Sequence, residues 1–169
     1  MEGIGIGMAY SFILLARFLS MPADAVLGRT VPNEFHDLAH HPEAKPVPGV
    51  VIYRFAVPLF FMNCTQFRRR VEALADAEAK LSAVVIDAVA IGGVDLAACE
   101  LLVELQAQLA ERGVRLLIAN MRTHARAQLA RGWPESTLMN LHYPSVGAAV
   151  ASVEAPVPVE VAVPRPVSG

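Results

Sequence analysis

The sequence predicts an α/β fold in which a mixed sheet of about five strands is packed with helices. Its clearest sign is the segment 83–119, where two apolar strands flank one long helix. The first strand, 83–87, is apolar without interruption until Asp87, which is typical of a parallel strand covered on both faces. The helix supplies the crossover connection that a parallel pair requires, so this segment is predicted to form a βαβ unit.

The helix of this unit has a predicted signal at each end. Asp95 lies immediately before it, where a carboxylate accepts hydrogen bonds from the free N–H groups of the first turn. Gly113 follows it and can adopt the left-handed conformation that ends a helix. The apolar residues between them recur at helical spacing and form the expected core face: Ala98, Leu101, Leu102, Leu105 and Leu109.

The elements before this unit follow from local patterns. We expect three strands there, at residues 24–29, 50–55 and 59–62. Four prolines between residues 30 and 49 predict an extended, irregular loop. Asn63 is expected to cap the next helix, because Gln66 stands at the third helical position as in a capping box. After the βαβ unit, short helices are expected near 123–131 and 145–152.

Composition excludes several classes of function. A net charge of −2 gives no reason to expect nucleic-acid binding. Cys64 and Cys99 have no spacing that predicts a disulfide framework or a zinc site. No serine lies in a nucleophile elbow and no cysteine has a histidine nearby in the sequence, so we expect no enzyme activity.

A resemblance to a known family rests on the segment that carries the two aspartates. A strand that ends in Asp87, a second aspartate eight residues later and the helix after it resemble the STAS domain. Further stretches are similar to the version attached to the C-terminus of SulP-family (sulfate permease) anion transporters: Asp24–Arg29, His41–Phe55, Pro58–Val71 and Tyr143–Val150. The resemblance therefore implies the STAS (anti-sigma-factor-antagonist-like) fold.

The resemblance also implies a function and a place in the cell. It implies a cytosolic regulatory and assembly domain of a secondary transporter for an anion such as sulfate or bicarbonate, which acts by contact and not by catalysis. Such a domain lies on the cytoplasmic side of the cell inner membrane, with the transmembrane domain of the parent transporter as its partner. A homodimer and a cytosolic protein partner stay open. A freestanding anti-sigma-factor-antagonist-like signalling module and a low-affinity nucleotide sensor are the alternatives.

The same resemblance divides the chain into three parts. Residues 1–20 correspond to the end of the last transmembrane helix, and we expect a truncated helix there. The uncharged stretch Gly3–Ala16 reaches about 21 Å as a helix, whereas the hydrocarbon of a bilayer is about 30 Å thick. Residues 21–152 are the expected STAS domain. The Pro/Val-rich residues 153–169 are expected to form a disordered tail.

The loop between the two aspartates is the candidate site for a ligand or partner. Its residues are Asp87, Gly92, Gly93, Asp95 and Leu96. The backbone N–H groups near the two glycines could form an anion-binding nest, which leaves weak nucleotide binding open, although a purely structural loop is the alternative. In freestanding STAS proteins a serine just after the second aspartate is phosphorylated. The matching residues here carry no hydroxyl: Leu96, Ala97 and Ala98.

Other side chains are weaker candidates. Arg68 is a candidate anion contact because it stands in the first turns of a predicted helix, and Arg122 and Arg126 are candidates because they are one turn apart; a solvated surface is the alternative reading. A loop also gathers residue types that bind metals: His36, Asp37, His40, His41 and Glu43. Its prolines disfavour the helix that would place two histidines on one face, so we expect no metal site and no bound cofactor.

Overall fold

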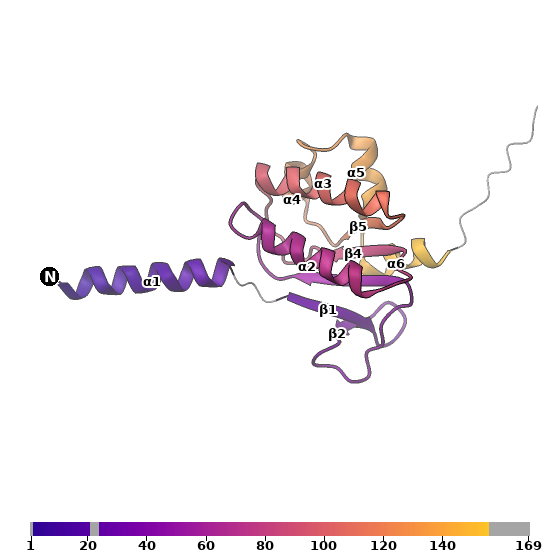
Figure 1. Ribbon diagram of the computed structural model, residues 1–169, viewed down its shortest axis with the longest axis horizontal. Helices are drawn as coiled ribbons and strands as arrows, with labels where there is room; N and C mark the ends of the chain where they lie inside the picture. Colours follow the sequence, from indigo (N-terminus) through magenta and orange to yellow (C-terminus); the bar gives the residue numbers. More distant parts are fainter. Residues whose placement is uncertain (1, 21–23, 156–169) are drawn as a thin grey trace, which may run out of the picture.

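The computed structural model describes residues 2–20 and 24–155, and it contains one six-stranded mixed sheet (Figure 1). The strand order is β2-β1-β3-β4-β5-β6. β1 is antiparallel to β2 and to β3, whereas β3, β4, β5 and β6 are parallel. The strands are β1 Asp24–Arg29, β2 Phe35–Asp37, β3 Val50–Phe55, β4 Ala83–Asp87, β5 Arg115–Ala119 and β6 His142–Tyr143. This sheet confirms the predicted fold class.

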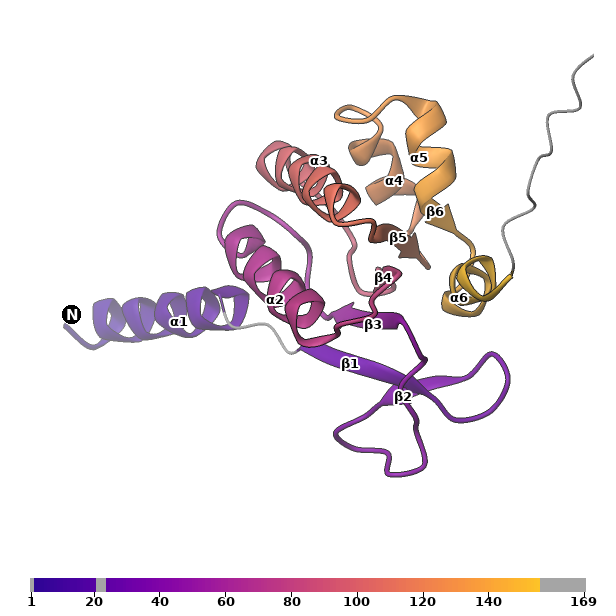
Figure 2. The same ribbon diagram turned by 45° about the vertical axis from the view of Figure 1, so that its right-hand side comes forward.

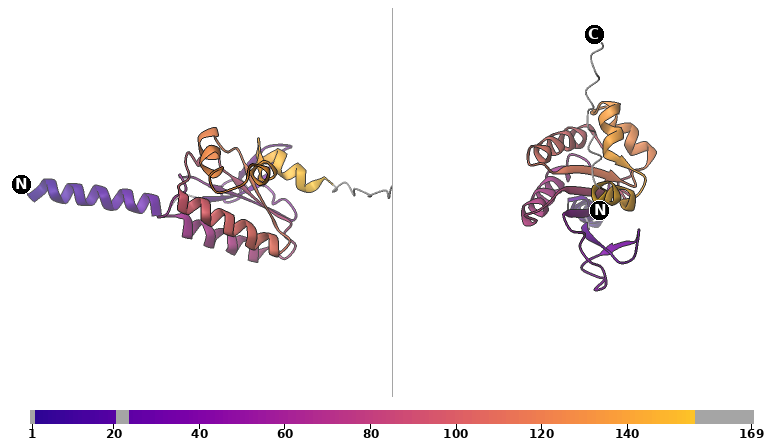
Figure 3. Two further views of the ribbon diagram at one scale, coloured as in Figure 1. Left: turned by 90° about the horizontal axis from the view of Figure 1, so that it is seen from above. Right: turned by 90° about the vertical axis from the view of Figure 1, so that its right-hand side faces the viewer.

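Helices cover both faces of the sheet, as the views in Figures 2 and 3 show. The helices are α1 Glu2–Ser20, α2 Cys64–Ala77, α3 Leu96–Glu111, α4 Thr123–Leu129, α5 Glu135–Leu141 and α6 Val146–Glu154. On one face α2 and α3 pack on the sheet over a large core, in which the ring of Phe67 lies 5.2 Å from that of Phe55. On the other face α6 alone covers a smaller core, which includes Ile52, Val85 and Leu117.

The predicted βαβ unit is confirmed. β4 and β5 are parallel, and Val85 pairs with Leu117. The Asp95 carboxylate accepts a hydrogen bond from the Ala98 N–H at 2.9 Å, and Gly113 has a φ of +73°. Leu105 is fully buried under α2, which confirms the predicted phase of α3.

Several predicted elements differ in the structure. Residues 59–62 are not a strand, because a single bridge between Leu59 and Val94 is followed at once by a turn into α2. Asn63 does not cap α2 with its side chain. Its buried amide instead holds the preceding turn, where it accepts from the Phe60 N–H at 3.0 Å and donates to the Pro58 carbonyl at 2.9 Å. The capping-box prediction is therefore wrong.

Three short elements were absent from the prediction: β2, α5 and β6. β2 lies inside the proline-rich loop and has only three residues, whereas β6 has two. Such short runs carry too few alternating residues to be distinguished from loop. The α6 helix continues to Glu154, two residues into the predicted tail, and residues 156–169 lie outside the described residues.

Helix α1 extends away from the sheet, as Figure 1 shows. Its large apolar side chains are exposed along the helix, including Ile6, Met8 and Phe12. None of the helices within residues 2–20 and 24–155 combines the length and the apolarity that a membrane crossing requires. That residues 1–20 are the end of a longer membrane helix stays a prediction.

Candidate functional site

The predicted loop follows the end of β4, where three neighbouring strands bring polar side chains together. We call this the carboxyl end of the sheet, where β3, β4 and β5 end at Phe55, Asp87 and Ala119. The opposite edge, where these strands begin, is the amino end. Asp87 is fully buried, although an ionised carboxylate without partners is costly to bury. Its neighbours on β3 and β5 supply those partners.

Both carboxylate oxygens of Asp87 accept hydrogen bonds within the chain. Arg54 of β3 donates from Nε at 2.7 Å, and Asn120, just after β5, donates from Nδ2 at 2.8 Å. The Val89 N–H donates to the same carboxylate at 3.3 Å. Asn120 adopts a left-handed φ of +58°, which asparagine tolerates better than most residues. Asp87 therefore ties three strand ends together.

Asp95 has two structural contacts where the sequence predicted one. Its Oδ1 caps α3, and its Oδ2 accepts from the Phe61 N–H at 2.9 Å. The Asp95 N–H donates to the Leu59 carbonyl at 3.3 Å, and the Leu59 N–H donates to the Gly93 carbonyl at 3.1 Å. The turn before α2 and the turn before α3 are thus joined through Asp95.

The two glycines of the loop do not adopt a left-handed conformation, which in this chain occurs at Gly49 and Gly113 among the described glycines. A side chain at Gly92 would meet open space, and one at Gly93 would stand 3.4 Å from Oε1 of Gln128. That same Oε1 accepts from the Val94 N–H at 2.8 Å. The N–H groups of residues 94 and 95 are therefore engaged within the chain, which reduces the donors of the proposed anion nest.

The three candidate arginines have different surroundings. Arg68 of α2 forms an ion pair with Glu104 of α3, so its charge joins two helices. Arg122, the residue before α4, and Arg126 of α4 form no ion pair with a described residue, and both follow the end of β5. Burial of His142 on β6 lowers its pKa, and the positive charge of Arg126 lowers it further. Positive charge is therefore available on this side of the carboxyl end.

The histidine-rich loop is arranged in separate pairs. His40 lies 2.6 Å from Asp37, His41 lies 3.1 Å from Glu43, and the His36 ring stands 4.6 Å from the His41 ring. The Ala39 N–H and then His40 lower the pKa of Asp37. In the described part of the chain, no three His, Cys, Asp or Glu side chains gather into a group that could hold a metal ion.

Sequence reasoning missed an exposed apolar surface at the carboxyl end. We call it the apolar rim, and it consists of Phe61, Met62, Val89 and Leu96. Phe61 is 68% exposed and Leu96 is 66% exposed. The Asp95–Phe61 hydrogen bond holds these two residues beside the same carboxylate. The sequence pattern predicts a strand at residues 59–62, whereas Phe61 and Met62 lie in a turn that exposes their side chains.

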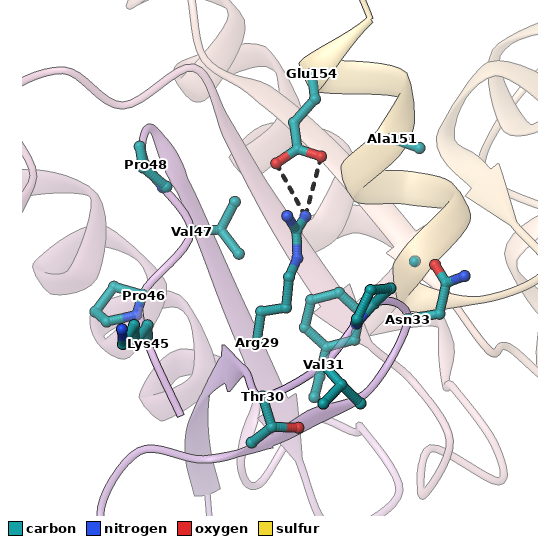
Figure 4. A pocket seen from close by; sticks show the side chains of 13 residues that line it. Arg29, Thr30, Val31, Asn33, Lys45, Pro46, Val47, Pro48, Ala151 and Glu154 are labelled. Atoms are coloured by element: carbon teal, nitrogen blue, oxygen red, sulfur yellow. Dashed lines mark hydrogen bonds and ion pairs between the residues drawn. The ribbon is translucent and has the colours of Figure 1, made fainter. Parts of the chain in front are cut away.

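A cavity of about 500 Å³ lies at the amino end, between the turn after β1, the loop that leads into β3, and α6 (Figure 4). Arg29 projects into it and donates to both carboxylate oxygens of Glu154, at 2.9 and 3.0 Å. The Arg29 guanidinium also lies 5.8 Å from the centre of the Phe35 ring. The charge of Arg29 is therefore already balanced within the cavity.

Comparison with known families identifies the segment that contains the two aspartates. Residues 41–133 match the model of the STAS domain, and this range includes Asp87, Asp95 and the whole loop between them. The chain belongs to the STAS domain family. Its sheet, with α2 and α3 on one face, is the STAS fold, and the resemblance stated from the sequence is confirmed.

The STAS chain is related to sulfate transporters. It is 35% identical over 130 residues to the probable sulfate transporter Rv1739c of Mycobacterium tuberculosis, covering 75% of this chain and 23% of that protein. It is 26% identical over 140 residues to sulfate transporter 3.1 of Arabidopsis thaliana, covering 76% and 21%. The chain thus spans less than a quarter of the length of these curated relatives.

Solved structures share the fold. The murine Slc26a9 anion transporter in the inward-facing state matches with a TM-score of 0.82 at 20% identity, over 92% of this chain and 26% of that one. The STAS domain of a SulP transporter from Vibrio cholerae matches with a TM-score of 0.51 at 15% identity, over 68% and 88%. Related STAS domains therefore form parts of larger transporters.

Proposed function

We propose that this STAS domain is the cytosolic regulatory and assembly domain of a SulP-type secondary anion transporter. The observation that carries the proposal is the 35% identity to a probable sulfate transporter. Sulfate or bicarbonate is the proposed anion, and the parent's transmembrane domain is the proposed partner. In this proposal the domain lies on the cytoplasmic side of the cell inner membrane, and transport itself occurs in helices outside this chain.

The helix α1 supports this arrangement. Residues 24–169 are 146 of the 169 residues, so a match to murine Slc26a9 over 92% of the chain extends into α1. The exposed apolar side chains of α1 suit a lipid or protein environment better than water. We infer that α1 is the last part of a membrane helix and leads directly into the domain.

Regulation in this proposal operates by binding and not by chemistry. The carboxylates of Asp87 and Asp95 are both engaged in hydrogen bonds within the chain, which argues against a role as a general base. The start of α3 offers no hydroxyl for phosphorylation, because residues 96–98 are Leu, Ala and Ala. In this proposal signals reach the start of α3 through a partner or a ligand.

The reading frame upstream of Met1 tests the proposal most directly. We expect it to encode a series of long apolar segments that continue into α1, and a frame without them would refute the transporter assignment. The complete protein, expressed in cells that lack sulfate uptake, should then accumulate labelled sulfate or bicarbonate. A stop codon after residue 20 should lower uptake or its regulation, and unchanged uptake at equal membrane abundance would contradict the regulatory role.

A further inference from the structure

The carboxyl end of the sheet combines three features that the proposed function does not use. The first is the position of α1. β1 begins at Asp24, which pairs with Phe55 at the end of β3. Four residue steps separate Ser20 from Asp24, and they span at most about 14 Å. The end of α1 therefore lies close to the carboxyl end, whatever direction the helix takes.

The second feature is the concentration of exposed apolar side chains. Outside α1, six large apolar residues of the described chain are prominently exposed, and four of them form the apolar rim. The other two are Val31, which lines the amino-end cavity, and Met139 of α5. Exposed apolar residues that gather on one side mark a contact surface more strongly than single scattered ones.

The third feature is positive charge without an internal partner. Arg29, Arg54 and Arg70 all form ion pairs with acidic residues of the chain. Arg122 and Arg126 form none with a described residue, and they follow β5 at the same end as the apolar rim. The acidic groups there are engaged: Asp87 by Arg54 and Asp95 by two N–H groups.

We propose that the carboxyl end of this domain contacts an anionic lipid surface, with Phe61 and Leu96 entering the headgroup region and Arg122 and Arg126 contacting lipid phosphates. This inference rests on the proposed function, which brings a membrane to α1. Apolar side chains beside basic ones are the combination that binds anionic bilayer surfaces. The opposite end lacks this combination: Lys45, Lys80 and Arg115 lie there without an ion pair to a described residue, but the exposed apolar residues away from the rim, Val31 and Met139, stand on separate elements.

A probe at the rim distinguishes this contact from attachment through α1. The full chain carrying Phe61→Trp is reconstituted into vesicles of phosphatidylcholine with phosphatidylglycerol, and tryptophan emission is measured with and without brominated lipid. The native Trp133 is buried and gives a constant background. We expect strong quenching at position 61 and none for the control Met139→Trp, whose neighbours Asn140 and Leu141 line a cavity with the first half of β5.

The role of the arginines is tested on the same Phe61→Trp chain. Arg122→Gln and Arg126→Gln should each lower the docking equilibrium about fivefold, the equivalent of about 1 kcal/mol per charge at an anionic surface. As a control, the double variant Arg112→Gln, Arg115→Gln removes two positive charges near the amino end and should leave the docking equilibrium unchanged. Quenching should also weaken as salt is raised, because exposed charges are screened.

Three results would overturn the proposal. Absence of quenching at position 61 in anionic vesicles would show that the rim does not reach lipid. Equal quenching in phosphatidylcholine alone, insensitive to both arginine substitutions, would show that lipid phosphates play no part. A blue shift without quenching that grows with protein concentration would assign the rim to a second copy of the chain. The proposed function is tested by the upstream reading frame, which none of these results affects. The two proposals can therefore fail independently.

Discussion

The two ends of the parallel strands use their charged residues in opposite ways. At the amino end, Arg29 and Glu154 form a partly exposed ion pair inside a cavity, and both groups face water. At the carboxyl end, Asp87 is fully buried and is held by Arg54 and Asn120. The Arg29–Glu154 pair joins β1 to α6 at the surface, whereas Asp87 and its two partners hold the ends of three strands together.

The two ends also differ in the apolar side chains that they expose to solvent. The rim of the carboxyl end presents Phe61 and Leu96 to solvent, although the carboxylates of Asp87 and Asp95 beneath it are held by hydrogen bonds within the chain. A rigid, satisfied interior beneath exposed apolar side chains indicates a surface prepared for contact, because the rim needs no rearrangement to bind. At the amino end Arg29 is balanced by Glu154, and among the described residues no comparable group of exposed apolar side chains gathers there. We therefore expect substitutions to affect stability and binding differently at the two ends.

The largest expected effect comes from the core that both ends share. Leu105 of α3 is fully buried, and Leu105→Ala should lower the free energy of unfolding by about 2–5 kcal/mol because it leaves a cavity. Gln108→Ala, on the exposed side of the same helix, should change it by less than about 0.5 kcal/mol. Chemical denaturation of both variants measures the difference. Equal midpoints would contradict the packing of α3.

The core and the βαβ unit could be predicted because local rules determined them. The apolar run before Asp87, the Asp95 cap and Gly113 each act through neighbouring residues, and each appeared as expected. The predicted strand at 59–62 failed because only Leu59 forms a bridge, whereas Phe61 and Met62 lie exposed in a turn, which a pattern of residue types does not reveal.

The candidate site was only partly predictable for a related reason. Asp87 and Asp95 were identified in the sequence, but three of their partners, Arg54, Asn120 and Phe61, lie 33 or 34 residues away along the chain. Arg54 and Asn120 meet Asp87 only because β3, β4 and β5 are adjacent and parallel. Polar residues at the ends of the predicted strands that became β3, β4 and β5 were an available signal, since such ends meet at one edge of a parallel sheet.

A second prediction compares the buried ion pair with an exposed one. Asp87→Ala should destabilise the domain by about 2–4 kcal/mol, because it leaves Arg54 and Asn120 without their acceptor. Asp76→Ala removes the exposed partner of Arg112 and should cost less than about 1 kcal/mol. Thermal unfolding of both variants gives the ratio. Similar losses would show that Asp87 is not the tie between strand ends.

The third prediction concerns the two oxygens of Asp95. Asp95→Ala should cost about 1–3 kcal/mol, because both the α3 cap and the Phe61 contact are lost. Asp95→Asn keeps one acceptor and turns an amide toward the other N–H, so we expect it to retain the cap and lose the second contact. Hydrogen exchange should then accelerate at Phe61 and stay slow at Ala98. Unchanged exchange at Phe61 would mean that the cap is the only role of Asp95.

A smaller effect is expected at the amino end. Glu154→Gln removes the ion pair with Arg29, and since both groups are more than a third exposed, the loss should stay below about 1 kcal/mol. Raised salt should reduce the difference between the variant and the natural chain. A loss of stability as large as that of Asp87→Ala would show that the ion pair at the amino end matters as much as the buried one at the carboxyl end.

The smallest effect is a shift in titration that reports the charge of the carboxyl end. Burial, and then the positive charge of Arg126, lowers the pKa of His142 on β6. Because the folded state binds this proton less well than the unfolded state does, the domain should lose stability as the pH falls below the ordinary histidine pKa of about 6.5. Arg126→Gln should move the pKa of His142 upward, as measured by NMR titration of its ring proton. Arg115→Gln, at the start of β5, should leave it unchanged. If both variants titrate like the natural chain, burial alone sets the pKa, and Arg126 must point away from the strand ends and toward solvent.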